Sequence, residues 1–240
     1  MERGAVAPRA TEGFDGGIIQ GGETTDTINN LLDLVYPPRC AFCGKPDARG
    51  VCQACAAKLP REKAPLHKGA FGKCAVPLRY DGIVRTAMLR FKFHGARFAA
   101  RGFGLLLARC AAEELGGEFD CVCWVPVSRQ RLRRRGYDQS YLLAREAARL
   151  WGTKPLRLLA KRRDTPPQSG MAAPERRANV LGAYKALAPE RLRGARVLLI
   201  DDILTTGATL SECVRTLAAA GTKSVVCACL ASAPPERCGK

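Results

Sequence analysis

The sequence predicts an α/β protein whose core is a doubly wound, mostly parallel sheet flanked by helices, preceded by a small N-terminal module that binds zinc. Three observations predict this architecture. Continuous apolar runs of strand length alternate with segments of helical periodicity, which favours parallel strands joined by crossover helices. One run leads into two aspartates and a threonine-rich turn, at the place where open α/β sheets bind ligands. Two CxxC pairs stand ahead of the sheet, spaced as metal ligands.

The composition is that of a folded and strongly basic protein. The chain has 240 residues, of which 47% are hydrophobic and 25% are charged, and its formal net charge is +17. These hydrophobic and charged fractions exclude a disordered chain. Most of the positive charge lies between Pro126 and Arg177. Such an excess implies an anionic partner, which could be nucleic acid, a phosphorylated metabolite or an anionic lipid, although a merely solubilising surface would have the same composition.

Hydropathy argues against membrane insertion and export. No apolar run approaches the ~20 residues that a membrane helix needs, and no apolar core of a signal peptide follows Met1–Gly4. We therefore expect no membrane insertion and a cytoplasmic location. Thiols stay reduced in the cytoplasm, so the twelve cysteines are expected to be metal ligands or small core residues rather than disulfides.

The elements follow in order along the chain. Residues 1–27 lack an apolar period and are expected to form a flexible leader. Apolar spacing predicts a short helix over Ile28–Val35, ended by two prolines, within a zinc-binding module of residues 28–64. An α/β domain is expected over residues 75–234. It is expected to start with an extended segment, Val76–Tyr80. Its expected strands are Cys121–Val127, Arg196–Ile200 and Ser224–Ala231, and its expected helices are Ile83–Phe93, Phe98–Leu115, Gln139–Trp151 and Ala208–Ala220.

The most informative stretch runs from Val197 to Thr209. Four apolar residues predict a buried strand, which delivers Asp201 and Asp202 at its C-terminal end. The following turn opens a helix whose first backbone N–H groups lack helical partners, so it suits a phosphate. The two carboxylates suit sugar hydroxyls, or a metal ion held through water. The alternative is a capped helix with two solvated acids. The candidate phosphate-binding residues are Thr205, Thr206, Gly207, Ala208 and Thr209.

Two further polar segments are candidates for the same site. The strand ending at Val127 should lie beside the first, which places Ser128 and Arg129 at the same sheet edge. An arginine-dense run follows, and guanidinium groups suit phosphate, although a solvated helix start is the alternative. Lys161–Tyr184 is polar, basic and proline-bearing and is expected to be a long mobile loop, which is either a lid over the ligand or a surface loop that never closes. The candidate anion-binding and lid residues are Arg131, Arg135, Gln139, Thr165, Gln168 and Arg176.

The N-terminal cysteines have the spacing of a metal centre. Cys40 and Cys43 form one CxxC pair, and Cys52 and Cys55 form another. Each pair can present two thiolates from one turn, and four thiolates complete the tetrahedral shell of a structural Zn²⁺ ion. A redox pair or an iron site is the alternative. The cysteines within predicted strands and helices are expected in the core, namely Cys121, Cys123, Cys213, Cys227 and Cys229.

The run from Val197 to Thr209 resembles the phosphoribosyl-pyrophosphate (PRPP) motif of type I phosphoribosyltransferases, in which apolar residues, two acids and a Thr/Ser-Gly turn follow each other. The resemblance implies a type I phosphoribosyltransferase-like sheet. It also implies that Asp201 and Asp202 are the catalytic acids and hold the ribose hydroxyls, that the turn holds the 5-phosphate, and that Mg²⁺ accompanies the pyrophosphate. Carboxylates beneath the ribose would stabilise positive charge that develops on the ring.

Further motifs narrow the resemblance to the ComF family of competence-associated phosphoribosyltransferase-like proteins, over roughly residues 31–230. The matching residues are Pro37–Cys40, Tyr80–Gly82, Lys92, Arg131, Leu132, Arg135–Gln139, Thr165–Gln168, Arg176 and Asn179. Asp138 departs from the asparagine that many relatives carry. The second cysteine pair of a double zinc ribbon is reduced here to Cys74, so a second zinc site is expected to be lost or degenerate.

Three functions are compatible with this resemblance. The first is an enzyme of DNA uptake (natural transformation) or related DNA metabolism that transfers phosphoribosyl from PRPP to an unknown acceptor. The second is a non-catalytic PRPP-sensing protein that binds single-stranded DNA alongside competence or DNA-processing proteins, although no aromatic-interleaved groove is evident. The third is a nucleotide-salvage phosphoribosyltransferase. Against it, Trp124 and Trp151 are expected in the core, and no aromatic set suited to reading a base is evident.

Overall fold

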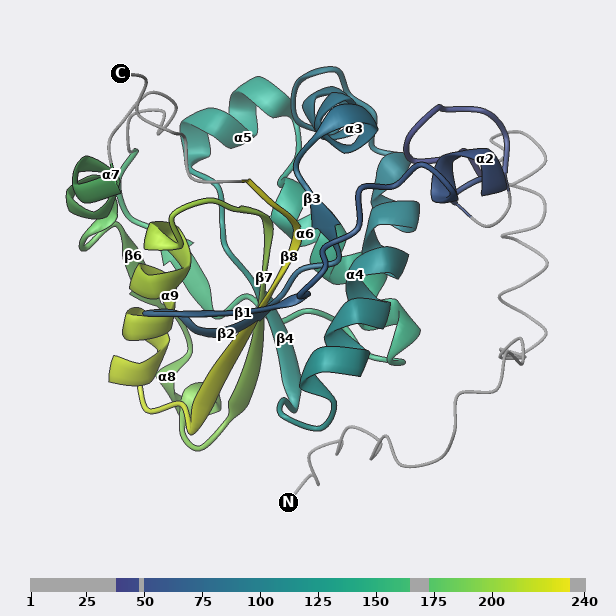
Figure 1. Cartoon of the computed structure of the whole chain (residues 1–240). Coiled ribbons are helices and arrows are strands. Elements are labelled where there is room, and N and C mark those ends of the chain that lie inside the picture. The colour runs from purple at the N-terminus through teal and green to yellow at the C-terminus, as the bar shows by residue number, and fades with distance from the viewer. Residues whose placement is uncertain (1–37, 48–49, 165–172, 234–240) are drawn as a thin grey trace, which may run out of the picture.

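The computed structural model describes residues 38–47, 50–164 and 173–233 (Figure 1). The expected leader (1–27), the expected helix over Ile28–Val35, the lid candidates Thr165 and Gln168 and the side chain of Arg176 lie outside the described residues. In what the structure describes, no helix is long and apolar enough to cross a membrane.

A six-stranded sheet forms the centre of the described part of the chain. Its strands are β1 Leu66–Gly69, β2 Gly72–Ala75, β3 Leu78–Arg79, β4 Cys121–Trp124, β7 Arg196–Leu204 and β8 Ser224–Ser232. The order is β1-β2-β8-β7-β4, with β3 paired to β8. Only the β1–β2 pair in this sheet is antiparallel. The mostly parallel sheet that the alternating apolar runs predict is therefore confirmed.

Helices cover both faces of this sheet (Figure 1). The helices of the first face are α3 Gly82–Phe93, α4 Ala99–Leu115 and α6 Gln139–Leu150, and α9 Ala208–Ala219 packs on the second face. Two apolar cores result. Leu198 and Ile200 of β7 belong to the first core, and Val197 and Leu199 belong to the second, because successive residues of a strand point to opposite faces. This double burial explains why the strand is a continuous apolar run.

The strand β7 runs past its predicted end at Ile200. It continues to Leu204, and Ile203 and Leu204 pair with Ala231 and Ser232 of β8. Asp201 and Asp202 are therefore residues of the strand itself, near its C-terminal end, rather than residues that follow it. The sheet ladder fixes their backbone, and with it the direction of their side chains.

The predicted long loop over Lys161–Tyr184 is wrong for its second half, where helix α7, Ala173–Val180, forms. The strands β5 (Leu159–Lys161) and β6 (Tyr184–Ala186) bracket this interval and pair antiparallel in a separate two-stranded sheet. Helix α7 packs on α9. It is short and polar, so its stability depends on contacts with residues distant in sequence, which propensity does not reveal. The remaining short helices are α2 Gln53–Ala56, α5 Arg129–Arg135 and α8 Pro189–Leu192.

The cysteine-bearing segment ahead of the sheet packs on α3 and α4. The ring of Phe42 lies 5.4 Å from that of Phe103, which in turn lies 5.5 Å from the ring of Phe91. The backbone at Gly50 approaches α4 so closely that a Cβ on Gly102 would lie 2.2 Å from the Gly50 carbonyl oxygen. Glycine at position 102 is what allows the two segments to touch.

Candidate functional site

A cavity of about 210 Å³ opens at the C-terminal ends of β4 and β7, next to the turn that begins α9. The pairing of Trp124 with Ile200 brings the two strand ends together, as the sequence predicts. Of the predicted ribose- and phosphate-binding residues, those that line the cavity are Asp201, Asp202, Thr205, Gly207 and Thr209. Open α/β sheets bind their ligands at this place.

The two aspartates have different surroundings. Asp201 Oδ1 accepts hydrogen bonds from Ser140 Oγ at 2.8 Å and from the backbone N–H of Asp202 at 2.9 Å. Asp202 Oδ2 lies 2.9 Å from Lys92 Nζ. Burial, followed by the charge of Asp202, raises the pKa of Asp201 to about 7, although both hydrogen bonds and the Lys92 ammonium group lower it. The pair therefore changes its charge near neutral pH.

The turn before α9 depends on glycine for two reasons. Gly207 has a φ of +74°, in the left-handed region that favours glycine. A Cβ at this position would also lie 2.4 Å from the ring of Phe71, which packs beneath the turn. Thr206 Oγ1 accepts a hydrogen bond from the N–H of Ala208 at 3.4 Å, so this pair shapes the helix start. Neither Thr206 nor Ala208 lines the cavity.

Ser128 and Arg129 lie beside the cavity rather than in its wall. Ser128 is buried, and its Oγ accepts a hydrogen bond from the N–H of Arg131 at 3.3 Å. It is thus the N-cap of α5. Arg129 is the first residue of α5 and is exposed. The wall at this strand end consists of Val125–Val127.

Helix α5 places two predicted anion-binding residues, Arg131 and Arg135, in the cavity wall. Arg135 Nη1 donates to Gln139 Oε1 at 2.8 Å, and its guanidinium carbon lies 5.0 Å from the centre of the Phe93 ring. Burial is the main reason that the pKa of Arg135 is lowered. Gln139 is fully buried behind this arginine, and its Nε2 has no hydrogen-bond partner among the described residues. Gln139 therefore supports Arg135 from within the core.

Four polar cavity residues are missing from the set that the sequence predicts. They are Lys92 of α3, Ser140 of α6, Lys161 of β5 and Tyr184 of β6. Lys161 and Tyr184 face each other in the β5–β6 pair, with Lys161 Nζ 5.3 Å from the centre of the Tyr184 ring. Burial lowers the pKa of Lys161 to about 8. The family pattern that contains Lys92 is the one signal in the sequence that could have found any of them.

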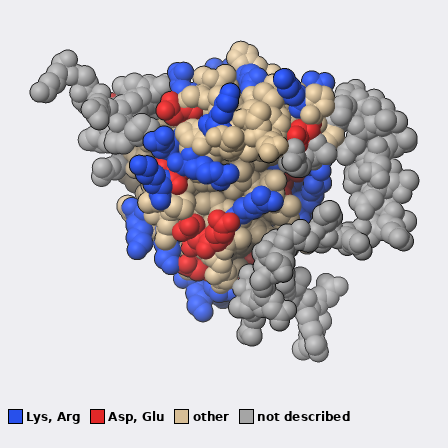
Figure 2. All heavy atoms as spheres, turned by 45° about the vertical axis from the view of Figure 1, so that its right-hand side comes forward, with Lys and Arg blue, Asp and Glu red and all other residues tan. Residues whose placement is uncertain are grey.

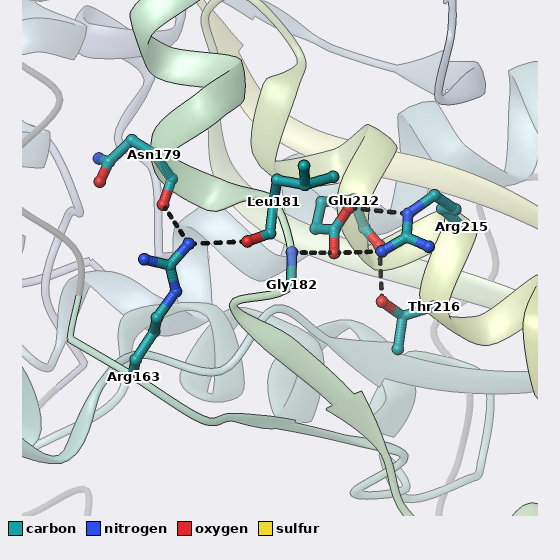
Figure 3. Close-up of polar contacts among 7 residues, drawn as sticks. All are labelled: Arg163, Asn179, Leu181, Gly182, Glu212, Arg215 and Thr216. Atoms are coloured by element: carbon teal, nitrogen blue, oxygen red, sulfur yellow. Dashed lines mark hydrogen bonds and ion pairs between the residues drawn. The ribbon is translucent and has the colours of Figure 1, made fainter.

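The segment between β5 and β6 is held at its described ends, as Figure 3 shows. Arg163 Nη2 donates to the carbonyl oxygen of Leu181 at 2.7 Å, just beyond α7. The N–H of Gly182 donates to Glu212 Oε1 at 2.8 Å, and Arg215 pairs with the same carboxylate at 2.7 Å. The Arg215 hydrogen bonds are the main reason that the pKa of Glu212 is lowered. These contacts attach the C-terminal end of α7 to α9.

Asp138, the departure from the family pattern, has a structural role. Its Oδ1 accepts a hydrogen bond from the N–H of Tyr141 at 3.1 Å, so it is the N-cap of α6. Its Oδ2 accepts hydrogen bonds from Trp124 Nε1 at 3.2 Å and from the N–H of Val127 at 3.1 Å. Burial is the main reason that its pKa is raised. The carboxylate joins the end of β4 to the start of α6.

The four N-terminal cysteines converge on one point. Their four sulfur atoms all lie within 4.8 Å of one another, and they belong to Cys40, Cys43, Cys52 and Cys55. Burial raises the pKa of Cys40, but hydrogen bonds from backbone N–H groups, those of Cys43 and Cys52 first, outweigh it and lower the pKa, whereas burial and the neighbouring cysteines raise the pKa of Cys55. Four thiolates in such an arrangement, with N–H groups directed at sulfur, fit a structural Zn²⁺ ion.

A second zinc cluster is missing from residues 38–47, 50–164 and 173–233, where the four cysteines form the only group of three or more candidate metal ligands. Cys74 is buried in the second apolar core. His67 Nε2 lies 3.5 Å from Glu62 Oε1. The cysteines that the sequence assigns to the core are buried at positions 123, 213, 227 and 229 and half-buried at position 121.

The basic character extends beyond the cavity. Figure 2 shows Lys and Arg side chains spread over one face of the molecule, around smaller acidic areas. On α5, Arg129, Arg133 and Arg134 are exposed. The outer side of the helix next to the cavity therefore presents guanidinium groups to solvent, and these suit an anionic partner.

Comparisons with known proteins match two domain families to different parts of the chain. The phosphoribosyl transferase domain family matches residues 134–238, and the double zinc ribbon domain family matches residues 31–86. The second match and the cysteine cluster together support structural zinc.

Named relatives span most of the chain. DNA utilization protein YhgH of Salmonella typhi is 30% identical over 225 residues, which cover 82% of this chain and 98% of that protein. Competence protein F of Haemophilus influenzae is 28% identical over 194 residues, or 78% of this chain and 82% of that protein. Competence protein ComFC of Streptococcus pneumoniae is 28% identical over 204 residues, or 82% of each chain.

Proposed function

The chain belongs to the ComF family, which includes competence protein F and DNA utilization protein YhgH, and on that premise we propose that it binds PRPP in the cavity between β4 and β7. The observation that carries the proposal is the arrangement of Asp201, Asp202 and the Thr205–Thr209 turn around one cavity. Carboxylates suit the two hydroxyls of a ribose, and the start of a helix suits its phosphate.

The remaining cavity residues suit the rest of PRPP. Arg131 and Arg135 lie in the wall, and forked guanidinium groups suit the oxygens of a pyrophosphate. Mg²⁺ would enter with PRPP, bound to its pyrophosphate, and would neutralise part of its charge. Residues 165–172 lie outside the described residues, so the proposed lid stays a prediction from sequence.

The proposed reaction is phosphoribosyl transfer. The bond between ribose C1 and the pyrophosphate oxygen breaks, the electron pair leaves with pyrophosphate, and an acceptor forms the new bond to C1. Positive charge develops on the ring between these events, and the carboxylates of Asp201 and Asp202 would stabilise it. The arginines would stabilise the departing negative charge in the same way.

A thermal-shift measurement tests binding. Mg²⁺-PRPP at a hundred times its Kd should stabilise the folded chain by about 2.7 kcal/mol, because it binds only the folded state. Replacement of both acids, Asp201→Asn with Asp202→Asn, should remove the shift. An equal shift in the double variant would contradict the assignment of the site.

Turnover is a separate question from binding. Pyrophosphate release should be measured from Mg²⁺-PRPP with bases, nucleotides and oligonucleotides as acceptors. Release that depends on one acceptor class identifies the chain as an enzyme. Binding of PRPP with no release across the panel favours the PRPP-sensing function.

A role in DNA uptake or DNA metabolism is the second part of the proposal. Relatives are named for competence and for DNA utilization, and the exposed arginines of α5 suit a phosphate backbone. Binding to single-stranded DNA should weaken steeply as salt rises, because each phosphate contact releases counterions. Absent or salt-insensitive binding would remove DNA from the partners of this chain.

A further inference from the structure

Helix α3 brings a lysine into the cavity from a part of the chain that neither matched family covers. The matched segments end at residue 86 and resume at residue 134, whereas Lys92 lies between them. Its Nζ lies 2.9 Å from Asp202 Oδ2, and the side chains of Lys92 and Asp202 are only 16% and 15% exposed. An ion pair so poorly exposed to water is weakly screened.

The helix does not need this ion pair to stay in place. Val84, Met88 and Phe91 are buried in the first apolar core, and the carbonyl oxygen of Phe91 accepts a hydrogen bond from Tyr137 Oη. Buried ion pairs contribute little net stability, since desolvation offsets their attraction. The position of Lys92 therefore calls for an explanation other than the anchoring of α3.

Two adjacent carboxylates in a confined cavity repel each other, and charged or titratable groups of the surrounding elements act on them. Those groups are Lys92 of α3, Arg135 of α5, Asp138 at the N-cap of α6, Lys161 of β5, Tyr184 of β6, Cys213 of α9, and Cys227 and Cys229 of β8. Arg131 of α5 lines the same cavity. Lys92 is in direct contact with one of the two acids.

We propose that Lys92 is a positioning residue of this cavity: its ammonium group compensates part of the charge of the Asp201–Asp202 pair and so favours the form in which both carboxylates are available to the two hydroxyls of a ribose. The inference rests on the proposed function for its ligand. Without the ammonium group, the cheapest response of the pair is to take up a proton. A protonated carboxyl is a poorer acceptor for a hydroxyl and a poorer partner for positive charge on the sugar.

The test compares Lys92→Met, which keeps the length of the side chain and removes the charge, with Lys92→Arg, which keeps the charge. Lys154→Met is the matched control, because Lys154 is exposed and does not line the cavity. Binding of Mg²⁺-PRPP to each full-length chain is measured by calorimetry from pH 5.5 to pH 9. Carboxyl resonances of ¹³C-labelled aspartate are titrated over the same range in the absence of ligand.

Lys92→Met should weaken binding about tenfold at pH 7 and move the acid limb of binding upward by about one pH unit, as the loss of one close opposite charge implies. For Lys92→Arg and Lys154→Met, PRPP binding should fall off at the same acid pH as in the parent chain. An unchanged limb in Lys92→Met, or an equal loss of affinity at every pH, would overturn the proposal.

The aspartate titration separates this inference from the proposed function. If no chain binds PRPP but the Asp201 titration moves upward in Lys92→Met, the proposed ligand is wrong and the charge compensation stands. If PRPP binds and neither the titration nor the acid limb moves, the proposed function stands and the role of Lys92 is refuted.

Discussion

The cavity at the ends of β4 and β7 and the cysteine centre both gather negatively charged groups, but they balance that charge in different ways. The centre takes its four thiols from residues 40–55, on neighbouring turns, and a single Zn²⁺ ion fits them all. The cavity takes its groups from α3, α5, α6, β5, β6, β7 and the start of α9, and compensates its acids with side chains. The cysteine centre can therefore be predicted from the spacing of cysteines in the sequence, whereas the cavity forms only when distant elements come together in the fold.

The largest expected effect concerns the centre. Cys43→Ser, or removal of zinc by a chelator, should unfold the segment around residues 40–55, because structural zinc contributes on the order of 10 kcal/mol in zinc-finger peptides. Thermal unfolding and metal analysis measure this loss. Cys121→Ser, outside the cluster, is the control and should keep both Tm and zinc. A zinc content well below one equivalent in the parent chain would contradict the assignment of a structural Zn²⁺ ion to this centre.

The next effect concerns the contact between the cysteine segment and α4. A Cβ at Gly102 would lie 2.2 Å from the Gly50 carbonyl oxygen, which is backbone and cannot move aside cheaply. Gly102→Ala should therefore lower the free energy of unfolding by about 1–3 kcal/mol. Urea denaturation checks this against Arg109→Ala, an exposed change on the same helix. Equal stability of the two variants would mean that the cysteine segment and α4 are not in close contact.

A further effect concerns Asp201, which is half-buried. Because the pKa of Asp201 is raised from 3.8 to about 7, the folded state holds a proton that the unfolded state has released. Stability therefore falls as pH rises between these two values and stays at its lower level above them. Asp201→Asn keeps both hydrogen-bond acceptances and should be more stable than the parent chain by on the order of a few kcal/mol at pH 8.

The same variant supplies its own control. Its advantage should shrink to near zero at pH 4, where the parent carboxyl is protonated in the folded state too. Urea denaturation at both pH values measures the difference. An advantage that does not change with pH would show that the acid is not under electrostatic strain.

The smallest expected effect concerns the segment between β5 and β6. Arg163→Ala removes the donor to the Leu181 carbonyl and should cost only about 1 kcal/mol, because the contact is exposed. Amide hydrogen exchange should nevertheless quicken in Ala173–Val180. Arg162→Ala, its exposed neighbour, should leave exchange unchanged. Equal exchange in both variants would remove Arg163 from the anchoring of α7.

The features that the sequence predicts are those set by local patterns, and the features that it misses are those set by contacts between distant residues. The cysteine cluster and the pairing of β4 with β7 are predictable, because CxxC spacing and buried apolar runs are local patterns. The helix α7 is not, since Arg163 and Glu212 hold it from outside its own sequence. The place of Lys92 in the cavity is not predictable from local pattern either, because a lysine at the end of an amphipathic helix is usually solvated; only the family pattern marks it.

PRPP binding at the twin acids is tested by calorimetric titration of Mg²⁺-PRPP into the zinc-loaded chain and into its Asp201→Asn, Asp202→Asn variant. We expect saturable binding to the parent chain and no detectable heat of binding with the variant, whose fold and zinc content should be unchanged. Absence of binding to the parent chain, or equal affinity in the two, would contradict this expectation.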